Sequence, residues 1–202
     1  DHYLIINPFF HSFGYKAGWL ATMIAGATAF PLAVFDVPTV IAQVQKHRIN
    51  VMPGPPTLFQ SLLGHKDFDR TKLQTLNKAT TGAAVIPTQL IKDMWEKLGL
   101  ETVITAYGLS ETCVLVTMCR RGDDAQTIAS TSGRSIPNIE VAIFDSDGNR
   151  LPAMEPGEIV VRGYNVMRSY FENPIATAET IDSEGWLHTG DIGFLDTNDN
   201  LH

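Results

Sequence analysis

The chain has 202 residues, of which 44% are hydrophobic and 18% are charged, and its formal net charge is −7. This length and composition are sufficient for one or two globular domains with a substantial core. The acidic balance, with Lys and Arg scattered along the chain, argues against a nucleic-acid partner.

The composition also argues against a membrane protein and a zinc protein. No apolar run reaches the roughly 20 residues needed to cross a bilayer, so we expect no transmembrane segment. The only two cysteines, Cys113 and Cys119, match no zinc-ligand spacing. We expect two buried thiols in a reducing cytosol, and therefore a cytoplasmic protein. The sequence leaves the oligomeric state open.

Short β-like runs alternate with helical patterns in the first part of the chain. Prolines at helix starts and glycines at helix ends mark several boundaries. Strands are predicted at 2–8, 27–33, 49–53, 78–82 and 101–108, and helices at 15–27, 37–48, 55–64 and 87–99. This alternation predicts an α/β fold with a mostly parallel sheet and flanking helices.

The pattern changes near residue 122. Residues 121–138 are polar and are predicted to form a loop, and strands follow at 139–145, 158–163 and 193–196. Turn sequences separate these strands, which is typical of a small β-barrel or sandwich. We therefore predict an α/β subdomain over 1–122 and a β-rich, barrel-like subdomain over 123–202.

The last residues of the chain, "DTNDNLH" (196–202), begin like a calcium-binding EF-hand loop. Leu201 stands where that loop requires glycine, so we predict a hairpin turn instead.

Unusual loops follow four of the predicted strands: "NPFFHSFG", "PGPPT", "TGAAVIP" and "AYGLSET". Ligands of open parallel sheets bind at the carboxyl ends of strands. In the last loop, Gly108 allows close backbone approach and Tyr107 offers a ring for stacking. Ser110 and Glu111 supply a hydroxyl and a carboxylate for phosphate and metal. Each residue alone has a structural explanation, but their joint placement at strand ends indicates a site.

Other chemistries fit the sequence less well. "GLSET" resembles the nucleophile elbow of hydrolases, with His11 and Asp191 as candidate partners. However, Thr112 stands where the elbow needs a small residue, and the order His, Ser, Asp departs from that of the hydrolase fold. Neither a P-loop nor a dinucleotide-binding fingerprint is present.

Five motifs in register resemble the adenylate-forming superfamily, which includes acyl-CoA synthetases, luciferases and the adenylation domains of peptide synthetases. The motifs are "NPFFHSFG", "TTGAA", "TAYGLSET", "GEIVVRGYNVMRSYFENPIAT" and "GWLHTGDIGFLDTNDNLH", and the resemblance covers essentially the whole chain. The family's phosphate loop would precede Asp1, and its catalytic lysine would follow His202. We therefore expect a fragment of the large N-terminal domain with little adenylation activity of its own.

The resemblance implies catalytic roles for three residues. Glu111 is similar to the acid that holds Mg²⁺ on the ATP phosphates. Ser110 stands where most relatives carry a phosphate-contacting Thr. His11 resembles a gate residue near the substrate carboxylate and the thioester tunnel.

The resemblance also implies a nucleotide-binding set. Tyr107 is similar to the ring stacked on adenine, and Asp191 to the carboxylate that accepts the ribose hydroxyls. The remaining members are the backbone wall Gly82, Ala83 and Ala84, and the flanking residues Thr105, Ala106, Gly108 and Leu109.

The implied reaction joins a carboxylic acid to coenzyme A (CoA) through an acyl-adenylate, with ATP as the co-substrate. The motif "FFHSFGYK" lacks the acid that adenylation domains use to pair with an amino-acid ammonium, and an unpaired buried ammonium would be costly. We therefore expect a hydrophobic acid without an α-amine, such as a fatty acid. A luciferase-like enzyme, another adenylation domain and a non-catalytic nucleotide-binding module remain alternatives.

Overall fold

The structure is a computed structural model that describes residues 1–82 and 84–202. It forms two compact units, each built from two segments of the chain. The first unit comprises Asp1–Thr105 and Arg120–Ser130, and the second comprises Ala106–Cys119 and Thr131–His202. Ala83, expected to be part of the backbone wall, lies outside the described residues.

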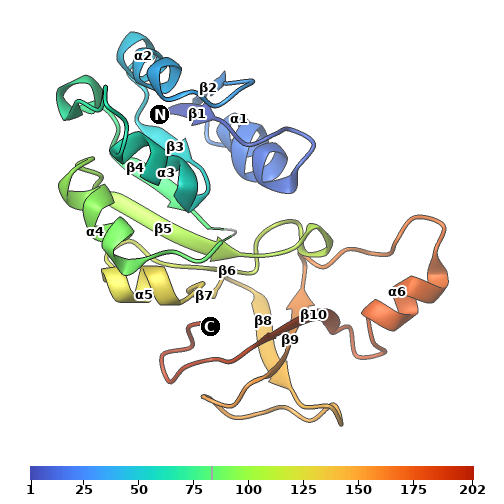
Figure 1. Cartoon of the computed structure of the whole chain (residues 1–202). Helices are drawn as coiled ribbons and strands as arrows, with labels where there is room; N and C mark the ends of the chain where they lie inside the picture. The colour runs from blue at the N-terminus through green and yellow to red at the C-terminus, as the bar shows by residue number, and fades with distance from the viewer. Residues whose placement is uncertain (83) are drawn as a thin grey trace. The chain divides into compact units, whose positions relative to one another are not determined.

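The first unit contains parallel strands in the order β2-β1-β3-β4-β5 (Figure 1). These are β1 (His2–Ile5), β2 (Thr28–Pro31), β3 (Val51–Pro53), β4 (Lys78–Thr81) and β5 (Thr102–Tyr107), of which the last two residues belong to the second unit. Every neighbouring pair is parallel, so the carboxyl ends of the strands lie at the same edge. The predicted α/β fold is confirmed.

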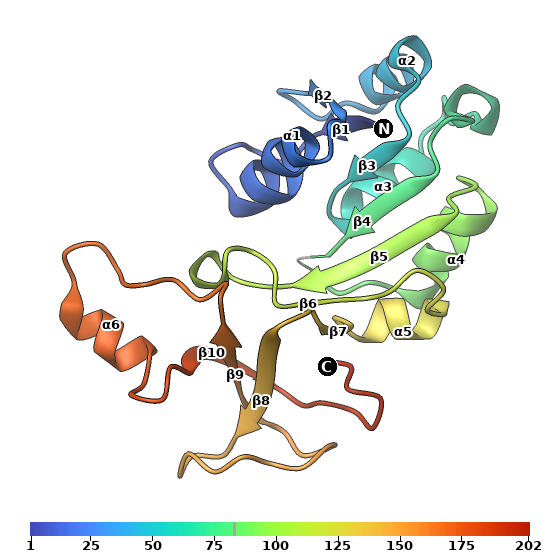
Figure 2. The ribbon, with the colours of Figure 1, turned by 180° about the vertical axis from the view of Figure 1, so that it is seen from behind.

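Helices flank this sheet, as the two views from opposite sides show (Figure 2). They are a π-helical segment Phe13–Leu20 (η1) that continues into α1 (Ala21–Ile24), then α2 (Val37–His47), α3 (Pro56–Leu63), the 3-10 turn η2 (Arg70–Leu73), α4 (Thr88–Glu96) and α5 (Ala125–Ser130). All four helices that the sequence predicted are present, as η1 with α1, α2, α3 and α4. The prediction of a continuous loop over 121–138 is wrong, because this polar stretch contains α5.

Helix α2 illustrates why the sequence specifies these elements. The Asp36 carboxylate accepts hydrogen bonds from the backbone N–H and the hydroxyl of Thr39, which caps the helix start, and Pro38 occupies the first turn. The buried side chains recur at helical spacing: Val37, Val40, Ile41 and Val44. Arg48 then adopts a left-handed conformation, with φ of 51°, and ends the helix.

The core of the first unit should be sensitive to lost volume. Phe59 on α3 is fully buried, so Phe59→Ala should lower the free energy of unfolding by about 3–5 kcal/mol. Urea denaturation measures this change. Phe10, which is 93% exposed, is the matched control, and Phe10→Ala should have little effect on unfolding. Equal effects of both substitutions would contradict the packing described.

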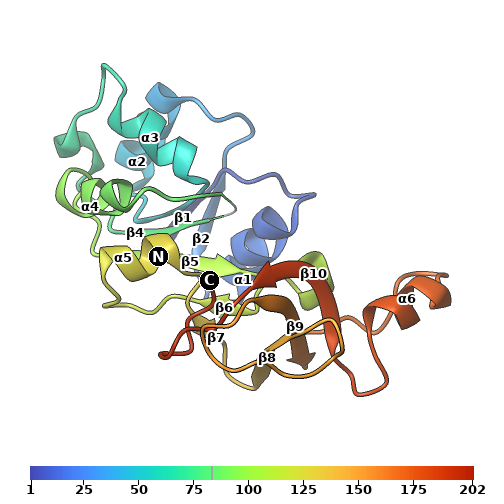
Figure 3. The same cartoon turned by 60° about the horizontal axis from the view of Figure 1, so that its bottom comes forward.

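The second unit contains an antiparallel three-stranded sheet in the order β10-β9-β8 (Figure 3). Its elements are the 3-10 turn η3 (Ser110–Thr112), β6 (Thr117–Met118), β7 (Arg134–Ser135), β8 (Ile139–Phe144), β9 (Gly157–Gly163), α6 (Pro174–Thr180) and β10 (Leu187–Gly193). The strand predicted at 193–196 is wrong in position. The observed strand ends at Gly193, and Leu195 forms only an isolated bridge with Leu201.

Both faces of the three-stranded sheet carry buried side chains. One face forms a cluster of Val116, Ile139, Val141, Ile143, Ile159, Val161 and Leu201. The ring of Tyr107 packs against this cluster. On the other face, Ala142 and Val160 pack with Trp186, and the Arg162 guanidinium lies 4.3 Å from the Trp186 ring centre. Successive side chains of β8 and β9 point to opposite faces, as the two-residue period of a strand requires, so consecutive buried residues belong to different clusters.

The two units exchange segments instead of meeting at a single cut near residue 122. Residues Ala106 and Tyr107 pair antiparallel with β6, and β6 pairs with β7, so residues 106–119 belong to the second unit. Helix α5 packs on α4 in the first unit, where Thr88 donates a hydrogen bond to the Gln126 side chain. Backbone pairing, rather than distance along the chain, therefore sets the division.

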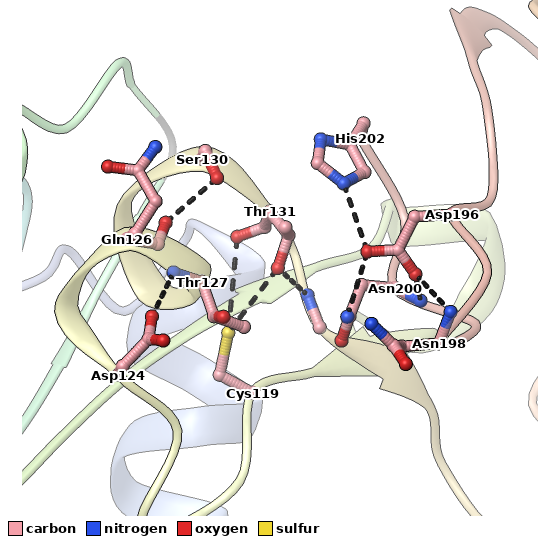
Figure 4. A network of polar contacts seen from close by, with 11 residues as sticks. Cys119, Asp124, Gln126, Thr127, Ser130, Thr131, Asp196, Asn198, Asn200 and His202 are labelled. Carbon is pink, nitrogen blue, oxygen red and sulfur yellow. Dashed lines mark hydrogen bonds and ion pairs between the residues drawn. The ribbon is translucent and has the colours of Figure 1, made fainter. Parts of the chain in front are cut away.

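The predicted hairpin turn near the end of the chain is present. The carboxylate of Asp196 accepts hydrogen bonds from the backbone N–H groups of Asn198 and Asn200 and lies 3.3 Å from His202 Nε2 (Figure 4). Burial raises the pKa of this carboxyl, but the hydrogen bonds from Asn200, Asn198 and His202 outweigh it and lower the pKa to about 2.

This shift predicts a pH-dependent contribution to stability. Because the pKa of Asp196 is lower in the folded state than in the unfolded state, ionisation of this carboxyl stabilises the fold. The contribution is complete above the unfolded pKa of about 3.9 and is lost as the pH falls toward the folded pKa of about 2. Asp196→Asn should therefore be less stable at pH 7, and the difference from the wild type should shrink between pH 4 and pH 2. Urea unfolding across this range measures it. Asp199→Asn, at an exposed position of the same turn, should leave the profile unchanged.

Cys113 and Cys119 are not joined by a disulfide. Cys119 is buried as predicted, with its sulfur 3.9 Å from the Thr131 hydroxyl (Figure 4). The prediction is wrong for Cys113, which is exposed because it lies in a left-handed turn directly after η3. Along the described part of the chain, no helix has the length and apolar character that a membrane crossing requires.

Candidate functional site

The second unit brings together two predicted site residues that are far apart in the sequence. The phenol of Tyr107 donates a 2.6 Å hydrogen bond to Oδ2 of Asp191 across 84 residues. Tyr107 lies at the end of β5, and Asp191 is exposed on β10. Burial, followed by the Asp191 hydrogen bond, raises the pKa of Tyr107, so its hydroxyl stays protonated at neutral pH. An aromatic ring and an accessible carboxylate are thus held side by side.

An irregularity in strand β10 determines where the Asp191 side chain lies. The pairing of β10 with β9 is regular up to His188 and resumes at Ile192, so residues 189–191 bulge opposite Ile159. Gly190 has φ of 74°, a conformation that L side chains rarely adopt. A bulge redirects side chains away from the regular alternation of the strand. The bulge therefore gives the Asp191 carboxylate its place beside Tyr107.

The loop after Tyr107 doubles back on itself. A Cβ on Gly108 would lie only 1.9 Å from the carbonyl oxygen of Val114, so no other residue fits there without displacing the backbone. Thr112 is fully buried, and its Oγ1 accepts from the N–H of Leu109. Val114 has φ of 85°, which is unusual for a β-branched residue. This tight return fixes the 3-10 turn that carries Ser110 and Glu111.

Glu111 is oriented by a residue that the sequence reasoning did not single out. Its Oε1 accepts a 3.0 Å hydrogen bond from the hydroxyl of Tyr170, and its backbone oxygen accepts from the N–H of Met167. The hydrogen bond to Glu111 raises the pKa of Tyr170. Tyr170 lies in the quoted segment "GYNVMRSYFENPIAT", so a search of that motif for a polar partner could have found it.

The buried side chain of Asn165 ties the same segment to the loop after Glu111. Asn165 is 4% exposed, and its amide donates a 2.7 Å hydrogen bond to the carbonyl oxygen of Leu115. This bond and the Tyr170 contact hold residues 163–170 against residues 110–115. Two of the sequence motifs therefore form a single structural feature.

Of the remaining predicted residues, Ala106 belongs to the second unit, and His11, Gly82, Ala84 and Thr105 lie in the first. His11 and Gly82 follow the carboxyl ends of β1 and β4, and Thr105 lies within β5, whose carboxyl end is at the same edge. His11 is exposed, and its Nδ1 accepts from the backbone N–H of Phe13. Thr105 is buried and donates to the carbonyl oxygen of Ile128. Ala84, which is exposed, follows Gly82 after the undescribed Ala83.

A multidentate metal site is absent from the described residues. They contain no group of three or more His, Cys, Asp or Glu that could hold a metal ion. Mg²⁺ does not require such a group, because it is usually held by one or two carboxylates together with phosphate oxygens. Glu111 fits that mode, because Tyr170 engages one carboxylate oxygen and an ionised carboxylate has a second.

The Tyr170–Glu111 contact can be tested directly. Replacing Glu111 by Gln removes the negative charge beside the phenol, so the pKa of Tyr170 should fall toward its ordinary value near 10. Titration of ¹³C-labelled tyrosine by NMR measures this. Glu172→Gln, a matched charge change two residues from Tyr170, should leave the Tyr170 titration unaltered. An unchanged titration in Glu111→Gln would show that the contact is absent in solution.

Comparison with known proteins gives a consistent result. Residues 1–171 match the family described as AMP-binding enzyme. A 3-[(3aS,4S,7aS)-7a-methyl-1,5-dioxo-octahydro-1H-inden-4-yl]propanoyl:CoA ligase of Rhodococcus jostii (strain RHA1) is 53% identical over 196 residues, which are 97% of this chain and 36% of the ligase. The ligase of the same name from Mycobacterium tuberculosis (strain ATCC 25618 / H37Rv) is 48% identical over 204 residues, or 100% of this chain and 38% of the ligase.

A solved structure supports the same relationship. The o-succinylbenzoate CoA synthetase of Bacillus subtilis, in complex with the acyl-adenylate intermediate OSB-AMP, superimposes with a TM-score of 0.86 at 29% identity. The match covers 100% of this chain and 40% of that one. The chain thus spans between a third and a half of the length of these relatives.

Proposed function

Because this chain belongs to the AMP-binding enzyme family, we propose that it is part of an ATP-dependent CoA ligase for a hydrophobic carboxylic acid without an α-amine. The observation that carries the proposal is the 2.6 Å hydrogen bond between Tyr107 and Asp191. A nucleoside presents a flat base beside a ribose diol, and this pair offers a ring beside a carboxylate. The CoA ligase names of the relatives support the reaction class.

The nucleotide roles follow from the chemistry of the two side chains. The ring of Tyr107 stacks on adenine, since an aromatic face binds a base without needing polar groups. Asp191 accepts hydrogen bonds from the ribose hydroxyls. Its Oδ2 already accepts one from Tyr107, but a carboxylate offers about four acceptor positions, so both ribose hydroxyls can be accommodated.

Main-chain groups on either side of Tyr107 belong to the nucleotide set in this proposal. Thr105, Ala106, Gly108 and Leu109 contribute main-chain contacts around Tyr107. The family resemblance assigns Gly82, Ala83 and Ala84 the role of a wall between adenine and the acyl group. Small residues suit this position, because they let a planar ligand approach the main chain closely.

Glu111 and Ser110 serve the phosphates. Attack by a carboxylate on the α-phosphate brings two anions together, so charge screening and positioning dominate the barrier. Mg²⁺, when bound with ATP, supplies the positive charge, and Glu111 is the residue that would hold it. The Ser110 hydroxyl, which is exposed, donates to a phosphate oxygen. The family resemblance assigns His11 a role as gate for the substrate acid and CoA.

We infer that the acid carries a bulky ring at the end of a short chain. The two relatives that are 53% and 48% identical are named for a propanoyl group on a bicyclic ring system. A straight-chain fatty acid is the runner-up. The proposed reaction forms the acyl–phosphate bond with release of pyrophosphate, and the thiol of CoA then forms the thioester with release of AMP.

The test is a substrate panel with the complete protein, ATP and CoA, in which AMP release is followed. Ring-bearing propanoic acids should give higher kcat/KM than straight-chain fatty acids with the same number of carbons, and amino acids should give no turnover. Preference for straight chains would reverse the assignment of the acid. No acid-dependent AMP release with any member of a broad panel would overturn the ligase proposal itself.

The same assay tests Glu111. Glu111→Gln should lower kcat by about 10²–10³-fold, as expected for loss of an electrostatic contact in the transition state, with little change in thermal unfolding. Glu172→Gln is again the charge-matched control and should retain full activity. Parallel loss of folding and activity in Glu111→Gln would assign Glu111 a structural role.

A further inference from the structure

We propose that Glu158 is a positioning residue that braces the bulge carrying Asp191 and thereby sets the enzyme's discrimination for the ribose of ATP. This inference rests on the proposed function. It adds a residue to which the sequence motifs assigned no role, and it names what that residue controls. Glu158 lies near the start of β9, the strand that pairs with β10.

The bulge leaves backbone groups without ladder partners. Between His188 and Ile192 the regular pairing with β9 is interrupted, so three residues of β10 lie opposite Ile159. Thr189 supplies one replacement, because its hydroxyl donates to the Ile159 carbonyl oxygen at 2.7 Å and accepts from the N–H of Asp191 at 3.1 Å. These bonds hold the two ends of the bulge, but not its central residue.

Glu158 supplies the contact at the centre. Its Oε1 accepts the N–H of Gly190 at 3.1 Å, and its Oε2 lies 2.7 Å from His188 Nδ1. A carboxylate can only accept, so Nδ1 is the donor in this contact. One carboxylate therefore ties the residue before the bulge to the residue at its apex. Hydrogen bonds to an ionised acceptor are shorter and stronger than neutral ones, which suits a residue that must hold a backbone segment without ladder partners.

His188 is itself fixed from its other side. Its Nε2 lies 3.6 Å from Oδ2 of Asp182, and its ring packs edge-on to Phe144 with centroids 6.3 Å apart. The side chains of Glu158 and His188 are 29% and 32% exposed, so both are partly shielded from water. The brace thus connects the bulge to the packed face of the sheet that contains Phe144 and Trp186.

The contacts of Glu158 determine where the Asp191 carboxylate lies. Asp191 follows Gly190 directly, so the conformation at Gly190 sets the direction of the Asp191 side chain. Glutamine at position 158 replaces the charged acceptor by a neutral amide, whose oxygen can accept from Gly190 or from His188 and whose nitrogen can meet His188 Nδ1 only if that nitrogen accepts. Glu158→Gln should therefore loosen the bulge without removing any group that touches the nucleotide.

The experiment compares ATP with 2′-deoxyATP in the complete enzyme. Glu158→Gln should reduce the ratio of kcat/KM for ATP to that for 2′-deoxyATP on the order of tenfold, mainly through a higher KM for ATP. The KM for the carboxylic acid should not change. In parallel, the peptide covering 187–193 should exchange its backbone hydrogens faster, as followed by mass spectrometry, because Gly190 loses its acceptor.

Glu140→Gln is the matched control. Glu140 lies on β8 in the same sheet and pairs with Arg162, and it makes no contact with the bulge in the described structure. This variant should leave both the nucleotide ratio and the exchange of 187–193 unchanged. If Glu158→Gln lowers kcat/KM equally for the two nucleotides, or leaves exchange at the wild-type rate, the inference is overturned.

Asp191→Ala separates this inference from the function beneath it. If Asp191→Ala abolishes the discrimination and Glu158→Gln does not reduce it, only the bracing role is wrong. If Asp191→Ala leaves the discrimination intact, the ribose role of Asp191 in the proposed function is wrong. In that case the exchange of 187–193 decides the bracing role: faster exchange in Glu158→Gln upholds it, and an unchanged rate refutes it.

Discussion

The hydrogen bond from the Tyr107 phenol to the Asp191 carboxylate is the constraint on which the candidate site depends. It can form only if β5 ends with the Tyr107 ring packed against the core of the second unit, and if β10 departs from regular pairing at residues 189–191. Both conditions are met by backbone features, namely the antiparallel pairing of Ala106 and Tyr107 with β6 and the bulge at 189–191. The site is therefore specified by main-chain geometry as much as by its side chains.

The two loops that carry the site residues solve a similar physical problem by different means. After Tyr107 the chain returns so tightly that only Gly108 fits beside the Val114 carbonyl, and Thr112 satisfies the freed backbone groups. Around Asp191 the bulge removes ladder hydrogen bonds, and Thr189 and Glu158 replace them. Unsatisfied backbone groups are costly even when half-buried, so these polar side chains are structural requirements of the loops. The hydroxyl and carboxylate groups in the motifs thus have two roles: some complete the hydrogen bonding of the backbone, and others are candidate ligand contacts.

Much of the fold could be predicted from the sequence, because hydrophobic period and the proline and glycine punctuation agree along the first unit. Helix α2 was found to within a residue for this reason. Helix α5 was missed because "AQTIAS" is short and polar and has only two buried residues. Strand β10 was displaced because "LHTGDIG" is interrupted by the bulge, which breaks the two-residue alternation. The Tyr170 and Glu158 contacts could not be predicted, since each joins residues 30 or more positions apart without any local pattern.

Each of the two candidate site carboxylates in the second unit is oriented by a phenol. Tyr107 donates to Asp191 at 2.6 Å, and Tyr170 donates to Glu111 at 3.0 Å. An arginine or lysine in either place would bind more strongly, but it would also cancel the negative charge. Burial and then the Asp191 hydrogen bond raise the pKa of Tyr107, and the Glu111 hydrogen bond raises the pKa of Tyr170, so each donor stays neutral at physiological pH. A neutral donor fixes the direction of a carboxylate and leaves its charge for the ligand. This is the property required of an acid that holds a metal ion and of an acid that accepts two hydroxyl groups.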